Sequence, residues 1–469
     1  EKHIQLLNEF QGKSKVKMMI GIDGEWGLFQ RFPAAHKFPW AMTLGAIQDN
    51  SLIYEMTSKI AEDCKRMGIY WDFAPVVDVN TNPANPIIGN RSFGSDINNV
   101  IAKGLAYAQG LQDNGVLASM KHFPGHGDTD TDSHLDLPVV SHNLERLNSV
   151  ELAPFKALLD KKIGGVMVAH LYVPALEKQS GIPASVSYEV ITNLLKKSYQ
   201  YNGLIITDAL NMNAVAKKFP AGELDLRAFK AGNDIMLFSQ DVPNGKALIK
   251  SALEKGEISE NRLAESVKKI LKTKYLLGLQ NLKSLNPENI NEDLNNASHA
   301  ELSEKLYSNA ITLLKDEKNL LPLSCSETYY YLPLEEAPFQ NFVENLNLGT
   351  TVKVISKNEI AQIPENSTVI VGFHKDNSTA YKSYKISQES KDILAELSKK
   401  QNVILDVFGS PYALKDVDIS KISTVLVSYE NNDLSMKASA KALLGKTKIS
   451  GKLPVIVNEN LKAGSGIEK

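Results

Sequence analysis

One segment of the chain concentrates residue types that can move protons. It runs from position 121 to position 134 with the sequence KHFPGHGDTDTDSH, and its glycines, proline and alternating aspartates indicate a loop. Within it, Asp132 and His134 are two positions apart, so both side chains face the same way if the backbone is extended. A carboxylate beside an imidazole fixes its tautomer and tunes its pKa. This pair could therefore act as a general acid and base.

Other interpretations of this loop stay open from the residues alone. A calcium-binding loop needs glycine at its sixth position and glutamate at its twelfth, where this loop has Ser133 and Val139. A zinc site could use three histidines and an aspartate, although the spacing of His122, His126 and His134 matches no strong template. A solvated acidic loop with satisfied histidines is the remaining alternative.

Asp208 is a second candidate, because it ends a fully apolar run over residues 203–208. It could cap the helix that follows, which is a common use of aspartate. With a proton-transfer pair at another strand end, a nucleophilic role becomes the better interpretation, since aspartate can form a covalent intermediate with a glycosyl group.

Several polar residues lie at or just after predicted strand ends, or in a following loop, and form a third group. Together they could hold hydroxyl groups or a carboxylate: Asp23, Arg31, Arg91, Lys121 and His122. For the two arginines taken singly, ordinary surface charge is the alternative.

The elements that must position these residues alternate over roughly the first 280 positions. Residues 51–67 place apolar side chains at spacings of three and four, which is one face of a helix. Short apolar runs lie between such stretches and are typical of buried parallel strands: 16–22, 69–76, 116–122, 164–170, 203–208 and 234–238. Repeated β-α units of this kind predict an α/β fold with a parallel sheet.

The polar candidates follow the ends of these runs. A (β/α)8 barrel collects its chemistry in this way, because all its parallel strands deliver their carboxyl ends to one face. An open doubly wound sheet would more often use a glycine-rich turn, and no G-x-G-x-x-G follows a strand. The sequence therefore predicts a TIM (β/α)8-type barrel. Six strands are counted, so we expect the first two strands upstream of residue 1, with residues 1–10 as the helix after the second.

The pattern changes after residue 280. Asparagines crowd a stretch without periodicity over residues 281–300, which is a linker candidate. A second set of apolar runs and helical stretches then predicts a smaller α/β sandwich domain. We expect a catalytic barrel domain over 1–280, a linker over 281–300 and the sandwich domain over 301–469.

The composition narrows the class of protein. The chain has 469 residues, with 52 Lys plus Arg against 54 Asp plus Glu and a formal net charge of −2. Near-neutral charge gives no electrostatic case for a nucleic-acid partner or a membrane surface. No apolar run approaches the roughly 18–20 residues that a membrane helix needs. The two cysteines, Cys64 and Cys325, predict no disulfide framework.

Taken whole, the loop over 121–134 resembles the long K-H-F-P-G-H-G-D-T-x-x-D-S-H signature of glycoside hydrolase family 3, specifically of its NagZ-like β-N-acetylglucosaminidase branch. Other segments resemble the family's nucleophile segment, its arginine loop, another strand, and the start and end of its second domain: 205–212 (IITDALNM), 90–94 (NRSFG), 73–78 (FAPVVD), 310–323 (AITLLKDEKNLLPL) and 450–454 (SGKLP). Trp26 stands where many members have glycine, which is similar to a variant among two-domain Bacteroidetes-type members.

The resemblance implies a retaining double displacement. Asp208 would attack the anomeric carbon, while His134, paired with Asp132, would protonate the leaving oxygen and then deprotonate water. Most glycosidases use two carboxylates for these roles, whereas a histidine acid/base is characteristic of this branch. The residues implied to bind the GlcNAc are Asp23, Arg31, Arg91, Lys121 and His122. No metal or organic cofactor is implied.

The implied substrates carry a terminal non-reducing GlcNAc, as muropeptide fragments in peptidoglycan recycling or short chitooligosaccharides do. A phosphorylase of the same family, using inorganic phosphate in place of water, is one alternative, and a non-catalytic sugar-binding module is another. The family variant suggests an extracytoplasmic bacterial enzyme, periplasmic, lipid-anchored or secreted. Some such members continue into a β-lactamase-like domain, so the native protein could extend beyond Lys469.

Overall fold

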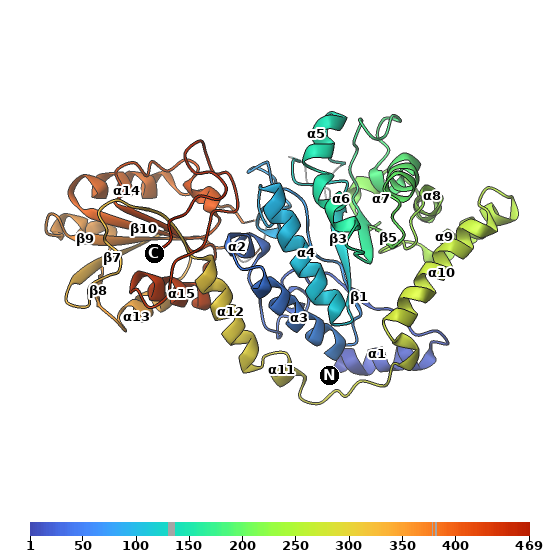
Figure 1. The fold of residues 1–469 in the computed structure, drawn as a ribbon, viewed down its shortest axis with the longest axis horizontal. Coiled ribbons are helices and arrows are strands. Elements are labelled where there is room, and N and C mark those ends of the chain that lie inside the picture. The colour runs from blue at the N-terminus through green and yellow to red at the C-terminus, as the bar shows by residue number, and fades with distance from the viewer. Residues whose placement is uncertain (130–136, 378, 380–381) are drawn as a thin grey trace. The chain divides into compact units, whose positions relative to one another are not determined.

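The computed structural model describes residues 1–129, 137–377, 379 and 382–469, and Figure 1 shows its fold. The contacts of the backbone divide the chain into two compact units. The first contains Glu1–Phe38, Ser51–Ile88 and Val100–Asn296, and the second contains Pro39–Asn50, Gly89–Asn99 and Ala297–Lys469. The chain therefore passes into the second unit twice within its first hundred residues.

The first unit is built on a sheet of parallel strands in the order β1-β2-β3-β4-β5. Their bounds are β1 (Gly21–Ile22), β2 (Trp71–Asp72), β3 (Leu117–Phe123), β4 (Gly165–Val168) and β5 (Leu204–Thr207). Because neighbouring strands run the same way, their carboxyl ends meet at one edge of the sheet. The predicted parallel α/β arrangement is confirmed.

The run over 234–238 does not form the full sixth strand that its sequence predicts. It makes a single bridge to β5, at Ile235. Beyond this bridge the Thr207 hydroxyl, and not a strand carbonyl, accepts the Leu237 N–H at 3.0 Å. Phe238 then has φ of 51°, a left-handed conformation that an extended strand does not contain. The prediction of a strand was wrong because side-chain bonding and this turn end the ladder.

A cleft of about 820 Å³ lies along this side of the sheet. Its lining is mostly apolar, with Met19, Trp71 and Ile235 among the residues, and it also includes Asp23 and Arg31. Two of the predicted substrate-binding residues therefore border open space in the first unit.

Ten α-helices alternate with the strands along the described part of the first unit or follow them. Their bounds are α1 (Lys2–Lys13), α3 (Ser51–Arg66), α4 (Ile97–Asp113), α5 (Leu144–Ser149), α6 (Ala153–Leu159), α7 (Asn213–Ala216), α8 (Glu223–Ala231), α9 (Val242–Glu254), α10 (Glu260–Leu276) and α11 (Ile290–Asp293). The helix predicted over 51–67 is α3, which buries Leu52, Met56 and Ile60 on one face. It packs closely on α4, because a Cβ atom at Gly110 would meet the Thr57 hydroxyl at 1.9 Å.

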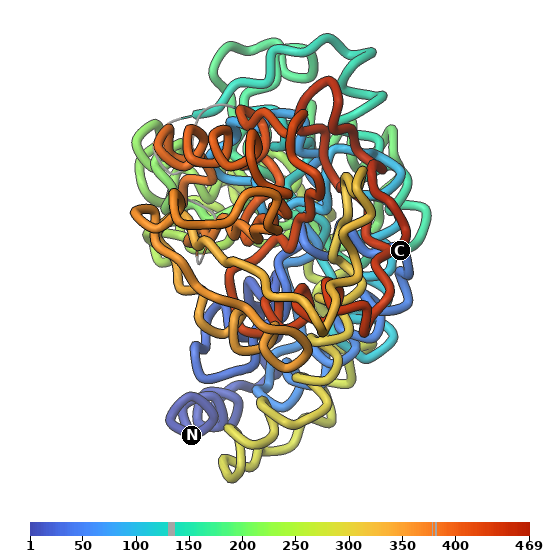
Figure 2. The backbone as a smooth tube through the Cα atoms, turned by 90° about the vertical axis from the view of Figure 1, so that its left-hand side faces the viewer, coloured from blue at the N-terminus to red at the C-terminus, as the bar shows by residue number. Residues whose placement is uncertain are grey.

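The N-terminal helix α1 lies beside the segment that follows α10. The Asn8 side chain donates to the Leu285 carbonyl and accepts the Leu285 N–H, each at 2.8 Å. Figure 2 shows the two segments, in blue and yellow, next to each other. The helix predicted over residues 1–10 is thus present and anchored within the first unit.

The second unit contains a six-stranded sheet in the order β6-β11-β10-β9-β7-β8. All neighbours pair in parallel except β6 with β11, which pair antiparallel. The strands are β6 (Thr312–Asp316), β7 (Thr328–Leu334), β8 (Thr351–Val354), β9 (Thr368–His374), β10 (Asn402–Phe408) and β11 (Thr424–Val427).

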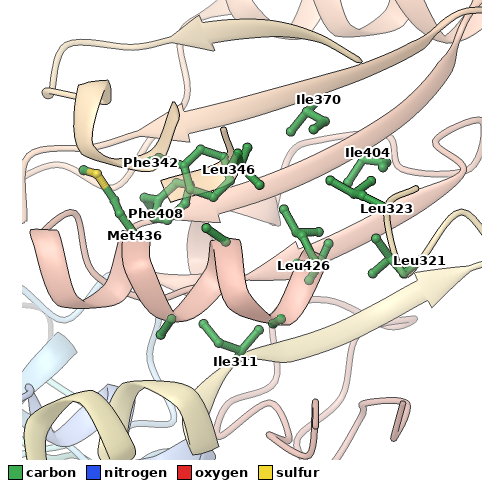
Figure 3. Close-up of a cluster of buried hydrophobic side chains, with 14 of the residues drawn as sticks. Ile311, Leu321, Leu323, Phe342, Leu346, Ile370, Ile404, Phe408, Leu426 and Met436 are labelled. Carbon is green, nitrogen blue, oxygen red and sulfur yellow. The ribbon is translucent and has the colours of Figure 1, made fainter. Parts of the chain in front are cut away.

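Helices cover both faces of this second sheet, as Figure 1 shows with α14 on one side and α13 and α15 on the other. The helices are α2 (Ala41–Ala46), α12 (Ala297–Ala310), α13 (Gln340–Leu346), α14 (Gln388–Lys400) and α15 (Asp433–Leu443). In Figure 3, Phe342 of α13 and Met436 of α15 lie beside Phe408 of β10, in a buried cluster that also includes Ile404. The second unit is thus an α/β sandwich, as predicted.

A buried glutamate holds the early segment 39–50 in the second unit. One carboxylate oxygen of Glu430 accepts the Trp40 N–H and the Thr43 hydroxyl, both at 2.8 Å, and the other accepts the Tyr307 hydroxyl at 3.0 Å. The polar stretch 281–296 belongs to the first unit, where Arg66 bonds the Asn286 carbonyl at 2.7 Å. Among the described residues, no helix combines the length and apolarity that crossing a bilayer requires.

Candidate active site

Several polar side chains lie at the carboxyl edge of the first sheet. Asp23 comes directly after β1, and Asp208 comes directly after β5. Lys121 and His122 are in the last part of β3, and His170 follows β4. Parallel strands bring these positions to one edge, as in the active sites of α/β barrels.

Lys121 is the centre of an ion-pair cluster. Its Nζ lies 2.9 Å from Asp23 Oδ1 and 2.7 Å from Glu25 Oε1, and its side chain is 1% exposed. A buried ammonium needs such partners, since an unpaired charge in the interior is costly. Asp23 also accepts a bond from Arg31 at 2.7 Å. The Arg31 side chain is 52% exposed, so the cluster has a solvent-facing side.

These contacts keep Asp23 ionised. Burial alone would raise its pKa, but the charge of Lys121 and the hydrogen bonds from Lys121 and Arg31 offset this, although nearby Glu25 works against them. The pKa of Asp23 therefore lies below its ordinary value. A paired carboxylate, ammonium and guanidinium offer both acceptors and donors to the hydroxyl groups of a sugar.

His122 is oriented by a buried carboxylate that the sequence analysis did not assign. Asp78 Oδ2 lies 2.7 Å from His122 Nδ1, and Asp78 Oδ1 accepts the His126 backbone N–H at 2.7 Å. Burial would raise the pKa of Asp78, but the charge on His122 and these hydrogen bonds hold it below its ordinary value. An ionised Asp78 fixes the ring orientation of His122 and places a proton on Nδ1.

His126 is itself buried, and its Nδ1 lies 2.8 Å from the Thr129 hydroxyl. Burial lowers the pKa of His126 to about 4. The ring is therefore neutral at physiological pH and contributes no charge to the loop.

Asp208 is a half-buried carboxylate on the same sheet edge. Its Oδ1 accepts the Ala209 N–H at 2.8 Å, and its own N–H donates to the Val168 carbonyl at 2.9 Å. Burial would raise its pKa, but electrostatic interaction with the His170 and His122 imidazoles and the hydrogen bond from the Ala209 N–H lower it below the ordinary value. Asp208 is thus ionised at neutral pH, as a nucleophilic carboxylate must be.

Asp72 lies fully buried behind this edge, at the end of β2. Its Oδ1 accepts the Gly24 N–H at 2.9 Å. Burial raises its pKa to about 7, with Asp23 and Glu25 adding to the rise and Lys121 opposing it. Asp23, Asp78 and Asp208 have lowered pKa values, whereas Asp72 holds its proton up to about neutral pH.

The predicted site residues do not all lie in this assembly. Asp132 and His134, the predicted acid/base pair, lie outside the residues that the structure describes. Arg91 ends the short helix Gly89–Arg91, which belongs to the second unit. Four of the predicted residues, Asp23, Arg31, Lys121 and His122, and the candidate nucleophile are placed within the first unit.

The described start of the long loop is anchored by a further group of charges. Asp128 Oδ2 lies 2.6 Å from His142 Nε2, and Arg146 lies 3.7 Å from Asp128 and 3.1 Å from Glu151. The ligand atoms of Asp128, His142 and Glu151 lie within 4.8 Å of one another, which is close enough for a metal ion. The Arg146 guanidinium, however, already supplies a positive charge to both carboxylates.

Two residues that contribute to the site, Glu25 and Asp78, were not predicted as site residues from the sequence. Signals for both were present, because Glu25 follows Asp23 by two positions and Asp78 ends the apolar stretch over 73–77. Neither signal reveals the partner, since Lys121 and His122 come from a different strand.

This arrangement defines a class of protein. A parallel sheet that presents an ionised carboxylate, an ion-paired lysine and a carboxylate-oriented histidine at its strand ends is the active-site edge of an α/β-barrel-type enzyme.

Comparison with known proteins identifies the family. Residues 2–273 match the model described as the glycosyl hydrolase family 3 N terminal domain. "Beta-hexosaminidase A" from Pseudoalteromonas piscicida is 32% identical over 96% of this chain and 84% of its own length. The chain belongs to glycosyl hydrolase family 3 and is a glycoside hydrolase.

Solved structures agree with this fold. A family 3 β-N-acetylglucosaminidase from Paenibacillus sp. str. FPU-7 is 30% identical, with a TM-score of 0.79 over 97% of this chain and 90% of that chain. "Beta-glucoside phosphorylase BglX" has a TM-score of 0.83 at 23% identity, covering 98% of this chain and 89% of its own, which shows the fold alone. The predicted class, a TIM-type barrel sheet followed by an α/β sandwich, is confirmed.

Proposed function

We propose that this chain is an exo-acting β-N-acetylglucosaminidase that removes terminal non-reducing GlcNAc with retention of configuration. The observation that carries the proposal is the ionised Asp208 at the end of β5, on the sheet edge that also holds the Lys121 cluster. The choice of sugar is supported by the names of the relatives, a β-hexosaminidase and a β-N-acetylglucosaminidase.

In the first step Asp208 attacks the anomeric carbon and forms a glycosyl ester, while the bond to the leaving oxygen breaks. His134, oriented by Asp132, gives its proton to that oxygen. In the second step water attacks the same carbon, His134 takes a proton from the water, and the ester bond to Asp208 breaks. Two inversions restore the β configuration. The roles of His134 and Asp132 rest on the loop motif.

The local bonding of Asp208 suits this role. The Ala209 N–H holds Oδ1 at 2.8 Å, so the direction of the carboxylate is set by the backbone. An ionised carboxylate in a half-buried position is less hydrated than one in water, and it needs no proton transfer before it attacks.

Sugar binding is proposed for the ion-pair cluster and its neighbours. Lys121 and Arg31 donate hydrogen bonds and Asp23 accepts them, which matches the hydroxyl groups of a hexose. His122 and Arg91 complete the proposed binding set. The five residues together would recognise the hydroxyl groups and the acetamido group of GlcNAc.

The proposal also includes the domain bounds, the substrates and the location of the enzyme. The catalytic domain is proposed to be residues 1–280, with a linker over 281–300 and the sandwich domain over 301–469. Muropeptide fragments of peptidoglycan recycling or short chitooligosaccharides are the proposed substrates, and the enzyme is proposed to be bacterial and extracytoplasmic.

Product analysis tests this function. The chain is incubated with an aryl GlcNAc glycoside, a muropeptide and a chitooligosaccharide, each with and without inorganic phosphate. Free GlcNAc at a rate that phosphate does not change is expected. Release of GlcNAc-1-phosphate would identify the enzyme as a phosphorylase instead of a hydrolase. If no GlcNAc product were released from any substrate, the proposal would be contradicted. Asp208→Ala should abolish turnover, while Asp160→Ala, at an exposed carboxylate of the same unit, should not.

A further inference from the structure

His170 is a buried histidine at the active-site edge that the mechanism above does not use. It follows β4 and is 0% exposed. Its Nε2 lies 3.0 Å from the Ala209 carbonyl oxygen, and its Nδ1 lies 2.7 Å from the Ser185 hydroxyl. The imidazole therefore joins the residue after Asp208 to a separate segment of the first unit.

The chemistry of these partners fixes the proton on one nitrogen. A carbonyl oxygen can only accept, so His170 Nε2 must carry a hydrogen and donate it to Ala209. When the ring is neutral, Nδ1 accepts from the Ser185 hydroxyl, and when the ring is charged, Nδ1 donates to that oxygen. The bond to Ala209 is thus the same in either protonation state.

Ser185, the hydroxyl partner of His170, is itself fixed by hydrogen bonds. Ser185 N–H donates to the Ala169 carbonyl at 3.1 Å, and the Ser185 carbonyl accepts from the Asn233 side chain at 2.9 Å. The same Asn233 amide donates to the Ala228 carbonyl at 2.8 Å. The Ser185 side of the His170 contact is therefore a buried, hydrogen-bonded segment and not a surface loop.

The near side of the connection is the backbone that carries the nucleophile. The peptide that joins Ala209 to Leu210 is held at its oxygen by His170 and at its N–H by the Leu237 carbonyl, at 2.8 Å. The preceding peptide supplies the Ala209 N–H that holds Asp208 Oδ1. Moving the Ala209 carbonyl would therefore turn the amide that sets the direction of the nucleophile.

We infer that His170 is a positioning residue for the Asp208 nucleophile, acting through its Nε2–H bond to the Ala209 carbonyl. The inference rests on the proposed nucleophilic role of Asp208. A histidine that merely fills the core would affect stability, whereas a positioning residue affects the rate of attack. Misplacing a reacting group by about 1 Å can cost about 100-fold in rate.

A matched pair of substitutions separates these roles. The amide nitrogen of glutamine reaches about as far as Nε2, so His170→Gln can keep the bond to Ala209. The amide nitrogen of asparagine lies near the position of Nδ1, so His170→Asn keeps only the Ser185 side. Ser185→Ala removes the hydroxyl partner and leaves the Ala209 bond in place. Thermal unfolding midpoints of all variants measure the structural effect.

The rate of covalent labelling is the decisive readout, because it reports attack by Asp208 and not overall stability. The probe is a GlcNAc derivative with an electron-withdrawing fluorine on the ring and a good leaving group, whose glycosyl-enzyme breaks down slowly. We expect His170→Asn to label about 100-fold more slowly than the wild type, and His170→Gln within about tenfold of it. KM for an aryl GlcNAc glycoside should change less than kcat.

Equal labelling rates in the asparagine and glutamine variants, whether both fast or both slow, would overturn the inference. This result is distinguishable from failure of the proposed function. If the wild type itself carries no label at Asp208, the nucleophile assignment fails. If the wild type is labelled there and the two variants do not differ, only the role of His170 fails.

Discussion

Replacing Asp72 by asparagine should stabilise the protein at neutral and alkaline pH. Asp72 is fully buried, its Oδ1 accepts the Gly24 N–H at 2.9 Å, and its pKa is raised from the ordinary 3.8 to about 7. Asparagine has nearly the same shape and keeps an oxygen that can accept this bond. Because it cannot ionise, it removes the cost of a buried negative charge.

The sign and size of the effect follow from the two pKa values. In the unfolded chain Asp72 loses its proton near pH 3.8, but in the folded protein it keeps the proton up to about pH 7. The folded state binds more protons over this range, so the free energy of unfolding falls as the pH rises. At 1.36 kcal/mol for each pKa unit, the loss is about 4 kcal/mol, reached at about pH 8.

The assay is urea-induced unfolding of the wild type and Asp72→Asn, followed by tryptophan fluorescence at several pH values. The stability difference should be close to zero near pH 4 and should grow to about 4 kcal/mol in favour of the variant near pH 8. Asp160→Asn, at an exposed carboxylate of the same unit, controls for the general loss of negative charge. A difference that does not change with pH, or one that favours the wild type at pH 8, would refute the reasoning.

Two further substitutions test the ion-pair network. Lys121→Met should destabilise the protein by about 3 kcal/mol, because it leaves Glu25 buried without the ammonium that lies 2.7 Å away. Its unfolding midpoint measures this, and a midpoint equal to that of the wild type would contradict the burial argument. Asp78→Asn should lower kcat/KM by about 100-fold, because the carboxylate that orients His122 is lost. Steady-state kinetics check this, and a decrease of less than twofold would mean that the orientation does not matter.

Much of the first unit could be predicted because its pattern is local. Apolar runs and a helical face at spacings of three and four identified β3, β4, β5 and α3 without tertiary information. Asp208 and Asp23 could be placed at one edge because parallel strands must bring their ends together. The run over 234–238 failed, because the Thr207 side chain takes the Leu237 N–H and Phe238 turns the chain.

The features of the fold and site that could not be predicted depend on contacts between residues far apart in the chain. Glu430 lies 390 positions from Trp40, yet its carboxylate holds the segment 39–50 in the second unit. Nothing in the sequence near residue 40 signals this contact. The same holds for Asp78, which orients His122 from 44 positions away. His170 is the last residue of the apolar run over 164–170, but its bond to Ala209 depends on how β4 and β5 pack.

Identification of the covalent intermediate tests the central claim most directly. The chain is stalled with the fluorinated GlcNAc probe, digested and analysed by mass spectrometry. One added sugar is expected on the peptide that contains Asp208, and none is expected in Asp208→Ala. A sugar on another carboxylate would contradict it, as would an active enzyme that forms no adduct and releases the α-anomer of GlcNAc first.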